Sequence, residues 1–370
     1  MRIALVTSSY YPRIGGIETH VRRLAEGFAG TGEQVTVITH QCGGAPAEEW
    51  DGEVRVLRFP LAARSRNYPI SPAMFRHLKS RAGDFDVVHG HNYHSIVGHA
   101  AAGSRVPFVF TPHYNATGHT WFRTRLHRLY RRIGARQFAA ADAVICVSDA
   151  EREALIRDFP DAAAKMVTIP NGTDPRLPAA DGTAGRAETP VLLTVGRLER
   201  YKNVDLVIDA FRVLPSEATL VVVGDGPDRA RLERHVRSAG RGGQVRFTGQ
   251  VPDPVLDDLF ARASVVTSAS DHEAFGLTLA EGLASGARVV ASAIPAHADL
   301  ARRAGAGSPV ALVDPRNARQ FADALETSLR AGRVQAGVTL PSWTDVVRDT
   351  REIYSRITED RPTARAHGAA

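Results

Sequence analysis

Residues 165–196 read KMVTIPNGTDPRLPAADGTAGRAETPVLLTVG and divide the chain into two parts with the same pattern. The outer hexapeptides, KMVTIP and VLLTVG, are short apolar runs rich in β-branched residues, which is typical of buried strands. The segment between them, residues 171–190, is rich in proline and glycine and has no apolar period, which is typical of a linker. We therefore predict one domain over 1–170, a linker over 171–190 and a second domain over 191–342.

On both sides of this linker, strand-like apolar runs alternate with amphipathic helical patterns. Examples are IALVTS (3–8) and PFVFTP (107–112) before it, and TLVVVG (219–224) and RVVASA (288–293) after it. Short β-branched runs divided by helices indicate parallel sheets built from βαβ units. The expected fold class is α/β, with two doubly wound parallel-sheet domains. Because ligands bind beyond the carboxyl ends of such strands, a cleft between the two domains is the expected site.

The C-terminal part of the chain holds one more helical pattern, over 343–358, which follows Pro341. This helix is predicted as a separate element that can pack back on the N-terminal domain. The remaining tail, 359–370, has few apolar residues to bury, so we expect it to be disordered.

Composition excludes several classes of protein. The chain has 370 residues, of which 44% are hydrophobic and 23% charged, as in ordinary globular proteins. No apolar run reaches the roughly 18 residues that suggest a membrane-spanning helix, and the N-terminus lacks the features of a secretory signal. Two cysteines are too few for a disulfide framework. We therefore expect a soluble, cytoplasmic protein.

The chain has a net charge of +6, and one of its segments carries a local cluster of basic residues. Seven basic residues lie between Arg123 and Arg136, and the aromatic pair Trp121 and Phe122 comes just before them. On a helix, several of these charges would share one face. Two interpretations stay open, a solvated helix face or peripheral docking on the anionic inner face of a membrane. Nucleic acid is not an expected partner, because no recognition motif or aromatic stacking platform accompanies the charges.

Arg197 and Lys202 follow the first strand of the second domain. Two cations in such a loop can clamp a diphosphate, arginine by paired hydrogen bonds and lysine as a point charge. A pair of surface cations is the alternative. Since the chain has only three lysines, the presence of one in this loop favours the diphosphate clamp.

Two glutamates, Glu273 and Glu281, are separated by seven residues in the segment SDHEAFGLTLAEGLASG (270–286). Glu273 follows a predicted strand, and Glu281 lies inside the helix predicted to begin near Gly276. The backbone N–H groups at that helix N-terminus form an anion site, and the carboxylates can accept hydrogen bonds from sugar hydroxyls. Together with the cation pair, this spacing predicts a site for a phosphorylated sugar.

Glycines and histidines of the first domain complete the candidate site. Gly15 and Gly16 interrupt the passage from the first strand to its helix, which lets the backbone approach a ligand closely. The pattern G-x-G-x-x-G is absent there, which argues against an NAD enzyme. No metal site is expected. Asp84 and Asp86 form a D-x-D at the amino end of a predicted strand, away from the ligand edge. The group His89, His91, His94 and His99 has no carboxylate or cysteine to complete a site, and His91 is assigned to the acceptor pocket.

Eight motifs, in order from about residue 3 to 315, resemble those of retaining glycosyltransferases of family four, which have the GT-B fold. The resemblance implies two Rossmann-like domains that face each other across a cleft. The paired glutamates together with the block G-R-x4-K are specific to this superfamily, whereas GDGP alone is not. The motifs are PRIGGIETHVRRLA, VVHGH, TPH, IPNGTD, VGRLERYKN, VVVGDGP, FTGQVPD and HEAFGLTLAEGLASGARVVAS.

The resemblance implies roles for particular residues. Arg197 and Lys202 would neutralise the donor diphosphate, Glu273 would hold hydroxyls of the donor sugar, and Glu281 the ribose. Backbone of three neighbouring residues would contact phosphate or sugar. His113 would sit near the transferred sugar. The three residues are Phe275, Gly276 and Leu277. Gly15 and Gly16 would approach the diphosphate, and the segment from Phe247 to Val251 would border the base.

Acceptor-side candidates are His91, Tyr114, Asn171 and His297. Asn171 matches a hinge asparagine, and a structural role in the linker is equally compatible with its position. His297 is a candidate because the chain has Ile294-Pro295-Ala296-His297 where the family often has a Gly-Gly pair, which changes the expected shape near the donor sugar.

The predicted function is metal-independent transfer of a sugar, with retention, from a UDP-sugar or GDP-mannose to an acceptor hydroxyl. The nucleotide sugar is a co-substrate, and no cofactor is expected. The acceptor is a cell-envelope lipid or glycan, or a small metabolite. Two alternatives stay open: a sugar phosphorylase of the same fold, and a non-catalytic subunit that binds nucleotide sugar for a partner.

Overall fold

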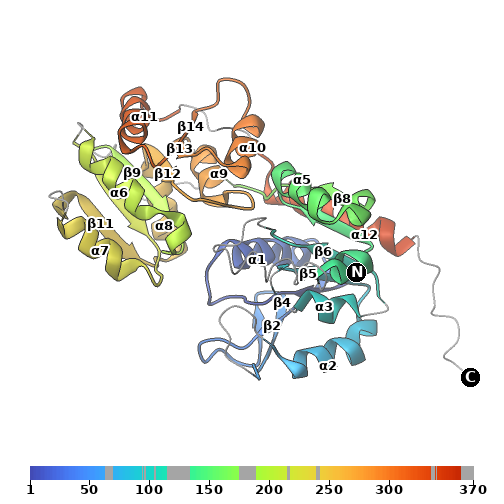
Figure 1. The fold of residues 1–370 in the computed structure, drawn as a ribbon. Helices are drawn as coiled ribbons and strands as arrows, with labels where there is room; N and C mark the ends of the chain where they lie inside the picture. Colours follow the sequence, from blue (N-terminus) through green and yellow to red (C-terminus); the bar gives the residue numbers. More distant parts are fainter. Residues whose placement is uncertain are drawn as a thin grey trace, which may run out of the picture. The chain divides into compact units, whose positions relative to one another are not determined.

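The computed structural model describes residues 1–62, 70–93, 95, 97–103, 106–114, 134–174, 189–214, 217–238, 242–334, 338 and 340–359. The chain forms two compact units. Unit 1 comprises Met1–Gly172 and Ser342–Ala370, and unit 2 comprises Thr173–Pro341. The chain therefore enters unit 2 once and returns to unit 1 before its last helix. Each unit contains one sheet with helices packed against it (Figure 1).

The sheet of unit 1 has eight strands in the order β3-β4-β2-β1-β5-β6-β7-β8. All neighbours are parallel except β3 and β4. The central strand β1 is apolar and fully buried after Arg2, with Ile3 in register between Val35 and Val87. The strands are β1 (Arg2–Val6), β2 (Gln34–His40), β3 (Glu48–Asp51), β4 (Val54–Phe59), β5 (Val87–His91), β6 (Phe108–Thr111), β7 (Ala143–Cys146) and β8 (Met166–Thr168).

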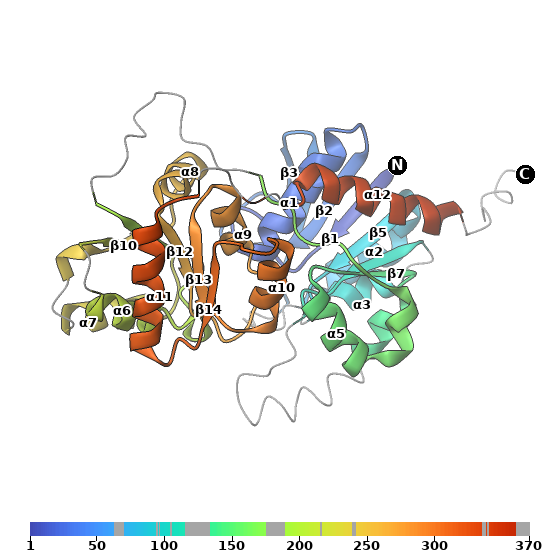
Figure 2. The same cartoon turned by 90° about the horizontal axis from the view of Figure 1, so that it is seen from above.

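The last helix of the chain, α12 (Trp343–Glu359), belongs to unit 1 and packs on α1 (Gly16–Ala29), as Figure 2 shows. The rings of Phe28 and Tyr354 stack with centroids 5.3 Å apart, and Val347 fills the space beside Gly27. This contact ties the C-terminal helix to the first helix. Unit 1 also contains the helices α2 (Pro72–Arg81), η1 (Ala82–Asp84), α3 (Val97–Ala102), α5 (Asp149–Asp158) and η2 (Pro160–Lys165), and residues 134–140 are helical as well.

The sheet of unit 2 has six parallel strands in the order β11-β10-β9-β12-β13-β14. These strands are β9 (Val191–Val195), β10 (Thr219–Val223), β11 (Val245–Gly249), β12 (Val265–Ser268), β13 (Arg288–Ser292) and β14 (Val310–Val313). The helices are η3 (Arg200–Lys202), α6 (Val204–Val213), α7 (Arg229–Ser238), η4 (Gly242–Gln244), α8 (Asp253–Arg262), α9 (Leu277–Ala284), α10 (Pro295–Arg303) and α11 (Ala318–Ala331).

The strand orders place one switch point in each sheet. In unit 2 the chain winds outward from β9 through β11 and then starts again at β12, on the other side of β9. In unit 1 the corresponding neighbours are β1 and β5. The loops that follow such a pair of strands diverge and leave a crevice at the carboxyl edge of the sheet. The predicted α/β class, with two parallel-sheet domains, is confirmed.

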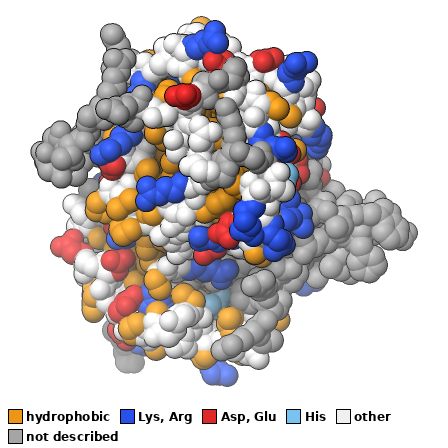
Figure 3. All heavy atoms as spheres, turned by 90° about the vertical axis from the view of Figure 1, so that its left-hand side faces the viewer, with side chains coloured by type: hydrophobic (Ala, Val, Ile, Leu, Met, Phe, Trp, Pro, Cys, Tyr) orange, Lys and Arg blue, Asp and Glu red, His pale blue; other side chains and the backbone are white. Residues whose placement is uncertain are grey.

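The surface charges of unit 2 are largely paired. On the side where α6 and α7 lie, basic side chains stand among acidic ones (Figure 3). Arg231, for example, contacts Asp228 at 2.6 Å and Asp205 at 2.8 Å. None of the helices within the described ranges is both long and apolar enough to span a membrane.

Candidate active site

The loops after β9 and β12 are joined at the switch point of unit 2. The Asp271 N–H donates to the Tyr201 carbonyl at 2.8 Å, and the Asn203 side-chain amide donates to the Ala269 carbonyl at 3.1 Å. The rings of Tyr201 and His272 also stack, with centroids 4.3 Å apart. These contacts fix the η3 turn, which carries Lys202, against the loop that carries Glu273.

Lys202 and Glu273 form an ion pair within this joint. The Lys202 ammonium donates to Glu273 Oε1 at 2.5 Å, and the Ser270 hydroxyl donates to the same oxygen at 2.8 Å. The two charged side chains are only 21% and 19% exposed. The sequence therefore folds two groups that lie 71 residues apart into direct contact, with one carboxylate oxygen shared by two donors.

The ion pair controls the protonation of both groups. Burial raises the pKa of Glu273, but the opposing effects of Lys202, His297 and the two hydrogen bonds prevail, so this pKa lies below its ordinary value. Burial alone would lower the pKa of Lys202, but Glu273 holds it above its ordinary value. Both groups are therefore charged at neutral pH, and the lysine presents a fixed positive charge at the edge of the sheet.

Arg197 lies in the same loop and is more accessible. Its side chain is 49% exposed, and its guanidinium donates to Glu199 Oε1 at 2.6 Å. Its positive charge also acts on Lys202 and lowers the pKa of that ammonium group, against the effect of Glu273. The structure thus places Arg197 close enough to Lys202 to reinforce one positive field, although its guanidinium pairs with Glu199.

Two glycines of the motif GDGP, Gly224 and Gly226, pack closely against the loop that carries Arg197. A Cβ on Gly224 would come within 2.0 Å of the Gly196 carbonyl oxygen, and one on Gly226 within 2.4 Å of the Leu198 carbonyl oxygen. Gly224 also has a φ of +120° and accepts no side chain without strain. The motif GDGP is therefore a packing partner of the candidate site, a role that only the fold reveals.

His297 connects the start of α9 with the ion pair, because it lies close to Gly276 and interacts electrostatically with Glu273. Gly276 precedes the helix with a φ of +94°, and no side chain caps the helix there. A Cβ on Gly276 would lie 3.2 Å from His297 Cδ2, and the charge of Glu273 acts on the same imidazole. Burial nevertheless lowers the pKa of His297, whose Nδ1 lies 2.9 Å from the Ser292 carbonyl. His297 is therefore a buried neighbour of both Gly276 and Glu273.

The remaining predicted donor-side residues of unit 2 follow the same strands. Phe275 and Glu281 are 4% and 8% exposed, and Glu281 lies on α9. Leu277 is the first residue of that helix. Val251 follows β11, where Gly249 accepts a hydrogen bond from the Gly224 N–H at 2.8 Å.

In unit 1, Gly15 and Gly16 lie at the start of α1, after β1. A Cβ on Gly15 would come within 2.4 Å of a Glu18 carboxylate oxygen, and the Ser9 hydroxyl donates to that side chain. Gly16, in contrast, has no atom within 4 Å of its ideal Cβ position. Gly16 is therefore the one of the pair that leaves open space, as a contact with a ligand requires.

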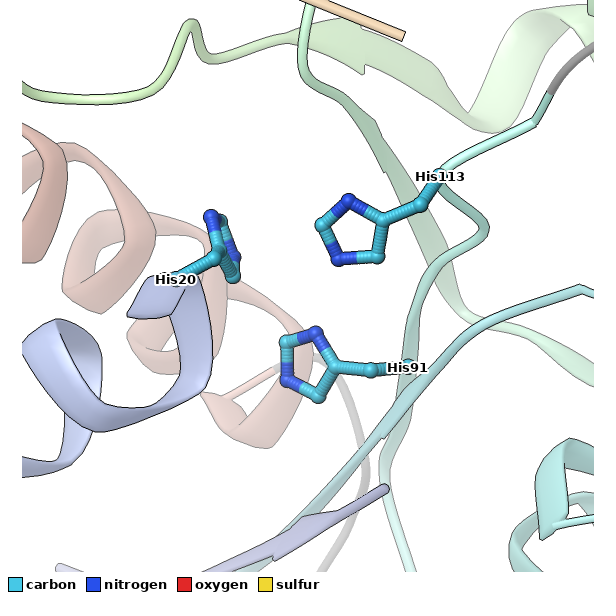
Figure 4. Close-up of side chains that lie close together, drawn as sticks. All are labelled: His20, His91 and His113. Atoms are coloured by element: carbon cyan, nitrogen blue, oxygen red, sulfur yellow. The ribbon is translucent and has the colours of Figure 1, made fainter. Parts of the chain in front are cut away.

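Three histidines meet at the carboxyl edge of the sheet in unit 1. His91 ends β5, His113 follows β6 with a φ of +47°, and His20 extends from α1 (Figure 4). We refer to these residues as the histidine cluster. In the sequence, His91 is grouped instead with His89, His94 and His99, for which no metal site was expected. Of these, His99 lies beside Gln137, at 2.9 Å, and His94 falls outside the described residues. His20 was missed, although its place on the apolar face of the first helix signals burial.

His89 packs behind the histidine cluster, with its ring 4.1 Å from that of His91. Its Nδ1 lies 2.6 Å from the Tyr354 hydroxyl and its Nε2 lies 2.8 Å from the Thr111 hydroxyl. Both ring nitrogens are therefore in use. This second contact between α12 and the sheet links the C-terminal helix to the strand that carries His91.

The other acceptor-side candidates in unit 1 are Asn171 and Tyr114. Asn171 is buried, and its side-chain oxygen lies 2.7 Å from His20 Nδ1. Tyr114 is 2% exposed, its N–H donates to Glu151 and its hydroxyl donates to Asp158. Burial raises the pKa of Glu151 to about 8, although the N–H groups of Tyr114 and Val147 oppose this.

Two further sequence features have simpler outcomes. Asp86 accepts hydrogen bonds from the backbone and guanidinium of Arg2, at 2.8 and 3.1 Å, so this part of the D-x-D pairs with the start of β1. Trp121, Phe122 and the basic segment from Arg123 to Arg132 lie outside the described residues, whereas Arg136 is described and exposed.

Known protein families match most of the chain. Residues 14–177 match the family described as Glycosyltransferase Family 4, and residues 182–335 match the family described as Glycosyl transferases group 1.

Two curated relatives extend over most of the chain. One is a D-inositol 3-phosphate glycosyltransferase of Xylanimonas cellulosilytica, 28% identical over 94% of this chain and 93% of the relative. The other is a GDP-mannose-dependent alpha-(1-6)-phosphatidylinositol dimannoside mannosyltransferase of Mycobacterium tuberculosis, 31% identical over 79% of each chain.

Solved structures share the fold. A sucrose-phosphate synthase from Thermosynechococcus elongatus gives a TM-score of 0.75 at 22% identity, over 98% of this chain and 100% of the other. The Anabaena protein HepE, in complex with UDP and glucose, gives 0.71 at 20% identity, over 97% and 98%. At these identities the likeness shows the fold alone, and it confirms the predicted GT-B class.

Proposed function

Because the chain belongs to glycosyltransferase family 4, we propose that it moves a sugar from a nucleotide-diphosphate donor to an acceptor hydroxyl, with retention and without a divalent metal. The observation that carries this proposal is the ion pair of Lys202 and Glu273 at the switch point of unit 2. A fixed ammonium at that edge is suited to a ligand that carries phosphate.

The chemistry requires stabilisation of the departing diphosphate more than a strong base. Negative charge grows on the diphosphate as the bond to the sugar breaks, and preorganised cations can stabilise it. Lys202 is preorganised by Glu273, and Arg197 is accessible enough to exchange Glu199 for phosphate. In this proposal the Glu273 carboxylate orients Lys202 through Oε1 and also accepts hydrogen bonds from hydroxyls of the donor sugar.

The other donor contacts follow the order of the loops. We assign the backbone at Phe275, Gly276 and Leu277 to the phosphate or the sugar, and Glu281 to the ribose. In unit 1, we assign Gly16 to contact with the diphosphate, and the open space at its Cβ position supports this assignment. His113 is assigned to the neighbourhood of the transferred sugar, with its imidazole neutral because burial holds its pKa well below the ordinary value.

The donor is a UDP-sugar or GDP-mannose, and the acceptor is a cell-envelope lipid or glycan or a small metabolite. The names of the two relatives described above both contain an inositol compound, which makes inositol phosphates and phosphatidylinositol glycosides the first acceptors to test. For a lipid acceptor, the basic segment from Arg123 to Arg136 would supply peripheral contact with an anionic membrane.

The test combines donor identification with stereochemistry. Thermal shift with UDP, GDP and their sugars identifies the donor, and NMR of the product formed with the stabilising donor gives the anomeric configuration. Retention with a UDP- or GDP-sugar supports the proposal. Inversion, or transfer to inorganic phosphate alone, would reject it.

A further inference from the structure

The histidine cluster has buried ring nitrogens that no hydrogen bond satisfies. His20 Nε2, His113 Nε2 and both ring nitrogens of His91 lack a partner among the described residues. The three side chains are 2%, 8% and 0% exposed. Buried polar atoms without a partner are rare and indicate a missing guest, such as a water molecule or an ion. Four such nitrogens in one small volume therefore need an explanation.

The three imidazoles surround a common space. One nitrogen from each ring lies within 4.8 Å of the others. The ring centroid of His20 lies 4.9 Å from that of His113 and 5.4 Å from that of His91. In both pairs the rings meet edge to face. Figure 4 shows the rings facing one another from α1, the end of β5 and the loop after β6. Three different elements thus contribute one ligand atom each.

The chemical state of the rings suits metal coordination. A metal needs the neutral imidazole. A neutral imidazole carries its proton on one ring nitrogen and a lone pair on the other. The buried ring nitrogens of His20, His91 and His113 that have no partner among the described residues are therefore the atoms that could bind a metal.

Asn171 orients one of the rings. Its side-chain oxygen, 2.7 Å from His20 Nδ1, accepts the proton of that nitrogen and leaves the lone pair on Nε2. Metal-binding histidines almost always donate their second nitrogen in this way, which fixes the tautomer and the ring. His89 is excluded as a ligand, because Tyr354 and Thr111 occupy both of its nitrogens.

We propose that His20, His91 and His113 form a site for one divalent transition-metal ion of the zinc type, with a fourth position open to water or another ligand. Three imidazoles favour zinc, cobalt or copper over magnesium or calcium, which prefer oxygen. Bonds of about 2.0–2.1 Å would draw the nitrogens inward by roughly 1 Å from the separations in the structure. His91 has both nitrogens available for this adjustment.

Occupation of the site would inhibit the enzyme, and this consequence rests on the proposed function. His113 cannot serve the transferred sugar while its ring is held by a metal. The ion itself lies in unit 1, whereas Lys202 and Glu273 lie in unit 2, so metal binding and donor binding can be measured separately. A bound water is the competing explanation for the unsatisfied nitrogens, and it predicts no metal dependence.

Binding is tested on the full chain after removal of metals with EDTA and dialysis. Cobalt titration should give the visible d–d absorption of four-coordinate cobalt, saturate at one ion per chain and be reversed by zinc but not by magnesium. His91→Ala and His20→Gln should each abolish the spectrum, with folding checked by circular dichroism. Asn171→Ala should weaken binding about 10-fold. The control is His77→Ala, which changes a half-buried histidine that packs on Phe59 outside the cluster.

The outcomes separate the two claims. A cobalt spectrum that is lost in the His20 and His91 variants and kept in the His77 variant supports the site. No spectrum, or a spectrum unchanged in both cluster variants, would overturn it in favour of a bound water. If the spectrum appears but zinc does not inhibit sugar transfer, the metal site stands and the assignment of His113 to the sugar is wrong.

Discussion

The Lys202 ammonium lies 2.5 Å from Glu273 Oε1, across the two loops that follow β9 and β12. This ion pair adds little to the free energy of unfolding, because the cost of desolvating the two charges offsets a large part of their attraction. The main effect of the contact is to fix the positions of the two side chains. It holds a cation at the switch point of the sheet, where the proposed function places the donor diphosphate, and it keeps the carboxylate ionised.

The ion pair predicts a specific pH dependence of stability. The folded pKa of Glu273 lies below its unfolded value, taken as 4.5, so its contribution is present above that pH and is lost on acidification through the folded pKa. The folded pKa of Lys202 lies above 10.5, so its contribution is present below that pH and is lost as alkaline pH passes the folded pKa. The free energy of unfolding, measured in urea from pH 7 to pH 3, should fall less steeply in Glu273→Gln. Parallel curves would contradict this account.

Gly224→Ala should destabilise unit 2 and weaken donor binding. The new Cβ would stand 2.0 Å from the Gly196 carbonyl, in a backbone with positive φ, so the loop that carries Arg197 must move. The strain alone is on the order of 1–3 kcal/mol. The control is Gly243→Ala, at an exposed glycine with open space around its Cβ position. Thermal unfolding and nucleotide titration of both variants test the prediction, and equal behaviour would show that the loop contact is unimportant.

Tyr354→Phe should destabilise unit 1 without altering the donor contacts in unit 2. The substitution removes the hydroxyl that lies 2.6 Å from His89 Nδ1 and leaves a buried nitrogen without its partner. Such a loss costs about 1–3 kcal/mol. Thr358→Ala, on the same helix, is the control, because the Thr358 hydroxyl donates to the Tyr354 and Ser355 backbone carbonyls within that helix. If Tyr354→Phe unfolds like the wild type in urea, helix α12 is not held through His89.

Sugar transfer should persist after removal of divalent metals. In the proposed mechanism, Lys202 and Arg197 supply the positive charge at the diphosphate, so no metal is needed there. Once any bound metal has been removed, initial rates with the identified donor and acceptor should be the same in EDTA and in magnesium. Activity that is lost in EDTA and restored by manganese would show that the cations do not suffice.

The sequence predicted correctly those features that depend on a single strand or a single motif. The segments VLLTVG and TLVVVG are short apolar runs rich in β-branched residues, and they form β9 and β10 of the parallel sheet. Lys202 and Glu273 could both be proposed because each follows a strand of this kind. Their direct contact could not, since it depends on β12 being the neighbour of β9 rather than of β11.

The histidine cluster shows the other limit. His91 and His113 could each be placed after a strand, but their meeting with His20 depends on how α1 lies across the sheet. Likewise, the contact of Gly224 with Gly196 joins loops after two adjacent strands, and no local pattern reports it. Contacts between elements that are distant in sequence, and set by packing, were the part that sequence reasoning missed.

The most direct test of the donor site is the rate of sugar transfer by Lys202→Ala beside that of Arg200→Ala. Both residues lie on η3, but Arg200 is 75% exposed and contacts Asp228. Loss of the Lys202 charge in the transition state should cost ~2–4 kcal/mol, or on the order of 10²–10³ in rate. The account predicts that loss for Lys202→Ala, with Arg200→Ala close to wild type. Nearly full turnover by Lys202→Ala would contradict it.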